Sequence, residues 1–317
     1  MIISQLIICT VAASGAAAAP AHTAQHVDVS VANGIAAVGE TIYVGGMTAG
    51  RIVRVGPGGG SEVLTAGHPR VRSVAALRHD PATGLLWGTA PDAFGRPGPA
   101  GETLREPSVV FAVDPQTGHH RHLIDFPPGA FTNDLVVAPD GTRFVTDSLG
   151  GRVWRIPRDA RTPVIHVEHP LLAGGGLGAA GIALDPDGTL YVNTYTAGRL
   201  LRIRGQAVEP LRTSRPLRNP DGMLALPDGN LLVLEGNAAG DAGRLLRLDI
   251  DGLDAAVTDI TEIDMPLNLT PFGGSVVLTD AAARPWLRGF LAGDAVEAPA
   301  ASRLIRIPLN TKQNRRD

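Results

Sequence analysis

Short runs of alternating apolar and polar residues recur along the chain, and this alternation is typical of half-buried β-strands. The most regular run has Gly or Ser, then Arg, two apolar residues, Arg and one apolar residue. Five segments carry it and 108–113 is a degenerate sixth: GRIVRV (50–55), GRVWRI (151–156), GRLLRI (198–203), GRLLRL (243–248) and SRLIRI (302–307). They begin roughly 45–60 residues apart, the spacing of small sheets repeated around a ring.

One repeat shows how each sheet is built. The segment from Asp221 predicts a first strand, a Pro-Asp-Gly turn at 227–229 and a second strand over 231–236. GRLLRL then forms a third strand, and a fourth is expected around 256–260. Further Pro-Asp-Gly turns stand at 139–141 and 186–188.

Superposing the repeats predicts six first strands, which begin near Asn33, Arg72, Asn133, Ala180, Asp221 and Asn268. The last repeat lacks a fourth strand, whereas the strand-like segment 26–31 has no repeat of its own. Joining the two leaves no exposed sheet edge. The sequence therefore predicts an all-β fold: a six-bladed β-propeller with four-stranded blades, closed into a ring by the N-terminal strand.

Composition narrows the class of protein. Apolar residues make up 44% and aromatic residues 4% of the chain, so we expect an aliphatic core. The net charge of −3 and the lack of an extended basic run argue against nucleic-acid binding.

Residues 1–24 resemble a secretory signal peptide, with an apolar, Ala-rich start that is too short to span a membrane. We therefore expect a secreted or periplasmic protein whose propeller covers 25–310, followed by a polar tail, 311–317. The only cysteine, Cys9, lies in the signal segment, so the mature chain would contain neither a disulfide nor a thiolate metal site.

The innermost strand of each propeller blade lines a central channel, so the residues that open the first strands face a shared axis. Four of the six are amides or a carboxylate, which are the oxygen ligands of a hard cation. The alternative is that these Asn and Asp side chains cap turns before the strands. The Gly- and Pro-rich insert 92–107 lies over one mouth of this channel, as a lid or as an idle surface loop.

The segments 131–148, 181–194 and 219–236 resemble the family of gluconolactonases, regucalcin (senescence marker protein) and luciferin-regenerating enzyme, which are six-bladed propellers. The resemblance extends over about 26–308. It implies one divalent cation in the channel, most simply Ca²⁺, and a small organic substrate. Carried over by position, it makes Asn33, Asn133 and Asp221 the metal ligands, with Asn133 also contacting substrate.

The chain departs from the family pattern at the metal site. The family's Glu ligand position is occupied by Asn33, its fourth-blade Asn position by Ala180, and an Arg near the third-blade Asn by Phe131. Arg72, Phe131 and Asn193 remain candidates for substrate binding. Asp221 and Asp147 are the candidate proton-transfer acids.

Asp134 in a first strand, and Glu235 and Asp280 at the ends of second strands, are further acids. For each of these acids and for Asp147, two roles are open. The carboxylate either belongs to the polar site in the channel or holds neighbouring blades together by accepting hydrogen bonds from backbone amides.

Three functions follow from these residues. The first is a secreted, monomeric hydrolase of lactonase type that opens a lactone or related ester with a divalent metal. The second is a non-hydrolytic propeller, cyclase-like or a carrier, that binds a small molecule without a functional metal site. The third is a protein-interaction propeller, which an axis of acids and amides disfavours.

Overall fold

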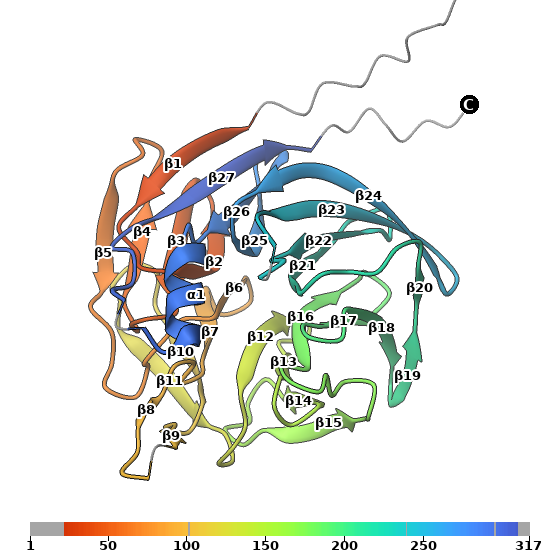
Figure 1. The fold of residues 1–317 in the computed structure, drawn as a ribbon, viewed down its shortest axis with the longest axis horizontal. Coiled ribbons are helices and arrows are strands. Elements are labelled where there is room, and N and C mark those ends of the chain that lie inside the picture. Colours follow the sequence, from red (N-terminus) through yellow and green to blue (C-terminus); the bar gives the residue numbers. More distant parts are fainter. Residues whose placement is uncertain (1–21, 101, 239, 295, 310–317) are drawn as a thin grey trace, which may run out of the picture.

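The computed structural model describes residues 22–309 apart from 101, 239 and 295. Six small antiparallel sheets stand around a common axis, as Figure 1 shows. Most of the predicted signal segment, 1–24, and the whole tail, 311–317, lie outside the described residues. The predicted propeller is confirmed.

The strands repeat the same order in every blade, from the axis outwards. The inner strands are β2 (Ala32–Val38), β6 (Ala76–Asp80), β12 (Thr132–Val137), β16 (Ala179–Leu184), β21 (Pro220–Ala225) and β25 (Pro266–Phe272). The second strands are β3 (Thr41–Gly46), β7 (Leu85–Ala90), β13 (Arg143–Asp147), β17 (Leu190–Thr194), β22 (Leu231–Glu235) and β26 (Ser275–Asp280).

The third strands are β4 (Ile52–Val55), β10 (Val109–Val113), β14 (Arg152–Ile156), β18 (Arg199–Arg204), β23 (Gly243–Asp251) and β27 (Ser302–Pro308). All six coincide with the repeated phrase, as predicted. The outer strands are β5 (Ser61–Thr65), β11 (His120–Asp125), β15 (Val164–Glu168), β19 (Ala207–Pro210), β24 (Asp254–Ile263) and β1 (Thr23–Val27). A short strand, β20 (Arg212–Thr213), adds to the outer edge of the fifth blade.

The N-terminal strand closes the ring, as predicted, by pairing antiparallel with the third strand of the last blade: Thr23 lies opposite Arg306, and Val27 opposite Ser302. The predicted position, 26–31, was wrong by about three residues, and β1 begins inside the predicted signal segment. Val29 and Val31 continue the alternation beyond β1 because they are buried in the connection to β2 rather than in a strand.

Aliphatic side chains fill the spaces between neighbouring blades. The arginines of the repeated phrase lie outside this core, where several pair with acids or loop carbonyls: Arg54 binds Glu62 and Arg202 binds Glu209 on the outer strands. The repeated arginines therefore stabilise the blades and do not take part in a site at the axis. Within the described residues, no helix has the length and apolar character needed to cross a bilayer.

Two long connections lie at the end of the ring where the inner strands begin. One is the insert 92–107, which contains a small ribbon of β8 (Arg96–Pro97) and β9 (Thr103–Leu104). The other carries the helix α1 (Arg284–Ala292), which begins with a proline in its first turn and ends at Gly293 in the left-handed conformation. Figure 1 shows α1 on the near side of the ring, in front of the strands.

Candidate functional site

Five of the six inner strands begin with a β-bulge, in which two residues stand opposite one residue of the second strand. Bulges redirect side chains and recur beside functional sites. We call the first residue of each bulge the axial position; it is occupied by Asn33, Asn133, Ala180, Asp221 and Leu267. The three predicted metal ligands thus occupy the same register in blades 1, 3 and 5.

Two of the predicted strand openings need correction. β6 begins at Ala76 without a bulge, so Arg72 lies four residues before the strand. Its half-exposed side chain lies 3.8 Å from Glu106 of the insert, at the rim. In the sixth blade the axial residue is Leu267, and Asn268 is the second residue of the bulge. Sequence reasoning placed Asn268 one residue out of register because it ignored the bulge.

Each polar axial residue is fixed through its backbone by the preceding blade. The hydroxyl of Thr89 donates to the carbonyl of Asn133 at 2.6 Å, and Thr279 donates to the carbonyl of Asn33 at 3.3 Å. Asn193 does the same for Asp221, donating from Nδ2 to its carbonyl at 2.6 Å while accepting from the amide of Gly181. Asn193, a candidate for substrate binding, is fully buried and both ends of its amide are engaged between blades.

Among the residues at axial positions, Asp221 is the one with a carboxylate side chain. Its side chain is buried, and no hydrogen bond or ion pair to its carboxylate occurs among the described residues. Burial, with a smaller contribution from the charge of Asp134, raises the pKa of Asp221 to about 8. Burial, and after it the charge of Asp221, likewise raises the pKa of the nearby Tyr195 hydroxyl. A buried, uncompensated carboxylate tends to take up a proton or a cation.

In the described part of the chain, neither axial asparagine accepts a hydrogen bond at its side-chain oxygen. Asn33 donates to the sulfur of Met47 at 3.3 Å, and its Oδ1 is buried without a partner. Asn133 donates from Nδ2 to the hydroxyl of Ser148 at 3.0 Å. Its amide nitrogen is thus held by a hydrogen bond, and its Oδ1 is the atom left to bind a ligand. The amide nitrogens of Asn33 and Asn133 thus donate to neighbouring side chains, which leaves the amide oxygens to bind a cation.

Asp147 is committed elsewhere. Its carboxylate accepts hydrogen bonds from the backbone amides of Phe131 and Gly150 and from Nε1 of Trp154. Glu235 and Asp280 are engaged in a similar way, each with a backbone amide and an arginine. Hydrogen bonds to backbone amides are what we expected if these acids hold the blades together instead of serving the channel. Of the two predicted proton-transfer acids, only Asp221 has uncommitted oxygens.

Phe131 lies at the mouth rather than among the polar groups. It is 8% exposed and lines a small pocket of about 80 Å³ with Asp92, Arg105 and Leu149. This pocket separates the insert from the third blade. Phe131 therefore offers an apolar wall near the entrance.

The sequence did not single out a second polar cluster deeper in the channel. Arg78 of β6 donates from Nη2 to both carboxylate oxygens of Asp134, at 2.9 and 3.0 Å, and to Oδ1 of Asn268 at 3.1 Å. Asp134 and Asn268 are the second bulge residues of blades 3 and 6, which face each other across the ring. The guanidinium therefore spans the channel. Nothing in the alternating segment 76–80 distinguished Arg78 from a surface arginine.

The insert and α1 meet at the mouth. Phe94 packs edge-on against Trp286 and Phe290, with ring centroids 5.1 and 5.2 Å apart. On its other side, α1 packs Trp286 and Leu287 onto a cluster that includes the axial Leu267. Arg284 anchors the helix by donating to loop carbonyls of the fifth blade, among them that of Asn237 at 2.8 Å. The two connections thus form a continuous cover over one side of the entrance.

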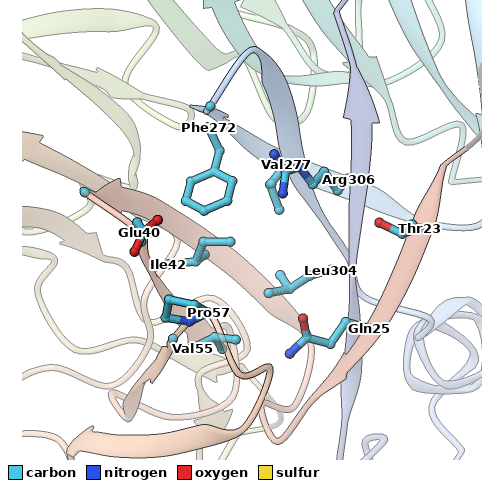
Figure 2. A pocket seen from close by; sticks show the side chains of 13 residues that line it. Thr23, Gln25, Glu40, Ile42, Val55, Pro57, Phe272, Val277, Leu304 and Arg306 are labelled. Atoms are coloured by element: carbon cyan, nitrogen blue, oxygen red, sulfur yellow. The ribbon is translucent and has the colours of Figure 1, made fainter.

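A cavity of about 420 Å³ lies away from these residues, at the seam of the first and sixth blades (Figure 2). Its wall combines apolar side chains such as Ile42, Leu304 and Phe272 with Glu40 and Arg306. Turns of the opposite end of the ring border it, at Gly39 and Gly273. The cavity is therefore separate from the axial residues.

The axial residues fit a divalent cation in their chemistry. No cluster of three or more His, Cys, Asp or Glu side chains suited to a metal occurs in the described part of the chain. A site here would depend on one carboxylate, Asp221, and on the amide oxygens of Asn33 and Asn133. The buried, unpartnered Oδ1 of Asn33 and the uncompensated Asp221 are the groups that such a cation would satisfy.

No protein-family model matches the chain, and no curated protein matches its sequence. Solved structures of other propellers do match its fold. A gluconolactonase from Xanthomonas campestris has a TM-score of 0.62 at 17% identity, with 91% of this chain and 90% of the other covered. A luciferin-regenerating enzyme has a TM-score of 0.61 at 12% identity, covering 92% and 96%.

Virginiamycin B lyase from Staphylococcus aureus has a TM-score of 0.59 at 14% identity, covering 91% of this chain and 100% of the other. Gluconolactonases and luciferin-regenerating enzyme, which the sequence resembles, are thus among its structural neighbours. At these identities the likeness shows the six-bladed fold. The neighbours differ in activity, so the fold does not select one reaction.

Proposed function

We propose that the chain is a lactonase-type hydrolase that opens a lactone or related ester at the axial residues, with one divalent cation, Ca²⁺ in the simplest case. The observation that carries this proposal is Asp221, a buried carboxylate without a partner among the described residues. It is in register with two asparagines whose side-chain oxygens accept no hydrogen bond from those residues either. The gluconolactonase and luciferin-regenerating enzyme among the structural neighbours support the choice of reaction class.

The residues would divide the work as follows. Asp221, Asn33 and Asn133 would hold the cation, which when bound polarises the ester carbonyl. A water molecule adds to the carbonyl carbon of the lactone. The bond between the carbonyl carbon and the ring oxygen breaks, and a proton from the water passes to the leaving alkoxide. Asp221 would hold the cation through one carboxylate oxygen and carry that proton on the other. Phe131 and the cover of Phe94 and α1 would exclude bulk water from one side.

The decisive experiment combines metal content with turnover. Purified protein should contain about one divalent ion per chain, and chelation should abolish hydrolysis of simple lactones until Ca²⁺ is restored. Asp221→Asn should lose both the ion and the activity. Asp147→Asn is the matched control, because its carboxylate holds a loop: it should keep the ion. Lactone turnover that is unaffected by chelation would overturn the metal-dependent reaction.

A non-hydrolytic function is the second candidate, and the axial Ala180 and Leu267 favour it because they supply no metal ligand in their blades. The likeness to a lyase points the same way. Reaction in ¹⁸O-labelled water separates the two, since hydrolysis places one labelled oxygen in the product and an elimination or cyclisation places none.

Export from the cytoplasm is proposed from the apolar segment 1–19 alone. N-terminal sequencing of the protein purified from the medium or periplasm tests it. A mature chain beginning near residue 25 is expected. Such a chain would lack Thr23 and Ala24, the first two residues of β1.

A further inference from the structure

We propose that the cavity between the first and sixth blades is a second binding site, which takes a short apolar peptide with free termini. We call it the seam cavity; Glu40, Ile42, Phe272, Leu304 and Arg306 mark its extent. It lies at the end of the ring opposite the axial residues, so the proposal does not depend on the reaction proposed for them.

The seam cavity has the size of a ligand site and apolar walls. Its volume of about 420 Å³ lies within the range of about 300–1,000 Å³ that small-molecule sites occupy. One wall comes from β3 and β4 of the first blade, through Ile42 and Val55, and the other from β26 and β27 of the sixth, through Val277 and Leu304. All four side chains belong to the packing between these blades. A ligand here would therefore bridge the two blades whose junction closes the ring.

Glycines at the rim keep the seam cavity open. Gly39 and Gly273 stand in turns with positive φ, 56° and 50°, where a larger side chain would strain the backbone. Gly56 has no such conformation, and a Cβ added there would meet no atom within 4 Å. Side chains of the neighbouring turns therefore leave the opening unfilled.

Two side chains of opposite charge stand on opposite sides of the seam cavity. Figure 2 shows Glu40 on one side and Arg306 on the other, with Phe272 and Ile42 between them. Nε of Arg306 donates to the hydroxyl of Ser275 at 3.2 Å, and its Cζ lies 5.0 Å from the centroid of the Phe272 ring. Among the described residues, neither the two Nη nitrogens of Arg306 nor the carboxylate of Glu40 has a hydrogen bond or an ion pair.

This arrangement matches a zwitterion with an apolar middle. The two Nη nitrogens of Arg306 suit a carboxylate, and the carboxylate of Glu40 suits an ammonium group. Apolar side chains of the ligand would rest on Ile42 and Leu304, and their burial supplies most of the affinity. A short peptide with free termini has all three parts in this order, whereas a ligand with one charge would leave Glu40 or Arg306 without a partner.

The test titrates the full-length chain with three peptides in a calorimeter: leucyl-phenylalanine, its N-acetyl form, which lacks the ammonium group, and its C-terminal amide, which lacks the carboxylate. Each is also titrated into Glu40→Gln and Arg306→Met. Gly56→Trp fills the seam cavity. Gly58→Trp is its matched control, because a Cβ at Gly58 also meets no atom within 4 Å but the residue lies outside the cavity.

We expect one leucyl-phenylalanine to bind per chain, with a dissociation constant on the order of 0.1 mM. Acetylation should weaken binding to the wild type about fivefold and leave binding to Glu40→Gln unchanged. Amidation should have the same effect on the wild type and none on Arg306→Met. Gly56→Trp should lose binding, and Gly58→Trp should keep it. The melting temperature of the wild type should rise with the peptide concentration, because the ligand holds the first and sixth blades together.

Three results would overturn the proposal. The first is that no peptide binds the wild type, including the case in which a terminal segment or a second copy of the chain fills the cavity. The second is that Gly56→Trp binds as well as Gly58→Trp. The third is that acetylation weakens binding to Glu40→Gln as much as to the wild type. If Gly56→Trp does not fold, the charge variants decide, because Glu40 and Arg306 are exposed.

Discussion

The buried carboxylate of Asp221 makes a prediction that runs against the usual effect of mutating a buried polar residue. In the metal-free protein, Asp221→Asn should stabilise the fold at neutral and alkaline pH. The pKa of Asp221 is raised from 3.8 to about 8. Below 3.8 the carboxyl is protonated in both states and contributes no pH dependence.

Between 3.8 and 8 the folded state holds a proton that the unfolded state has lost, so stability falls as the pH rises. At about 1.4 kcal/mol per pH unit, the penalty grows to about 3 kcal/mol at pH 6 and about 5 kcal/mol at pH 8. Asparagine removes this penalty. Its unpaired amide costs about 1–3 kcal/mol at every pH, so the difference between pH values is the quantity to measure.

Urea unfolding in chelator at pH 4, 6 and 8 gives the required free energies. The wild type should lose stability relative to Asp221→Asn by several kcal/mol between pH 4 and pH 8. Asp147→Asn should instead destabilise by about 1–3 kcal/mol, because Asp147 accepts hydrogen bonds that an amide cannot fully replace. Parallel stability curves for the wild type and Asp221→Asn would show that Asp221 has no raised pKa in the folded protein.

Four further outcomes follow. Ca²⁺ affinity should rise about tenfold per pH unit between pH 6 and 8, measured by calorimetry, because a proton must leave Asp221 first. Asn193→Leu should cost about 2–4 kcal/mol in urea unfolding, since it leaves two buried backbone groups unpaired. Phe94→Ala should speed proteolysis within 92–107 and raise KM, while the melting temperature stays the same. Deleting 22–27 should remove the cooperative unfolding transition or produce dimers, because it exposes the edge of β27.

The scaffold could be predicted because its determinants are local and repeated. The phrase GRLLRL and its copies mark third strands wherever they occur, and Pro-Asp-Gly marks the turns before second strands. The helix α1 was not predicted, although Pro285 near its start and Gly293 at its end are ordinary signals of a helix. Its sequence is short and lies where every other blade has a loop.

The site could be predicted only in part. Asn33, Asn133 and Asp221 were placed in register correctly because each stands two residues before the regularly paired part of its inner strand. Arg72 and Asn268 were misplaced because a bulge adds one residue without a sequence signal, and the second blade has none. Arg78 was missed because its importance comes from two residues that lie 56 and 190 positions away along the chain.

The pairing of β1 with β27 also governs the order in which the molecule can be made. Among the described strands, synthesis delivers β1 first and β27 last, so the sixth blade stays incomplete until β27 has left the ribosome. Until then, the first and fifth blades expose the apolar flanks that pack against the sixth blade. We therefore expect a truncation that removes β27 to expose both of these flanks and to promote aggregation, an effect larger than the loss of one strand.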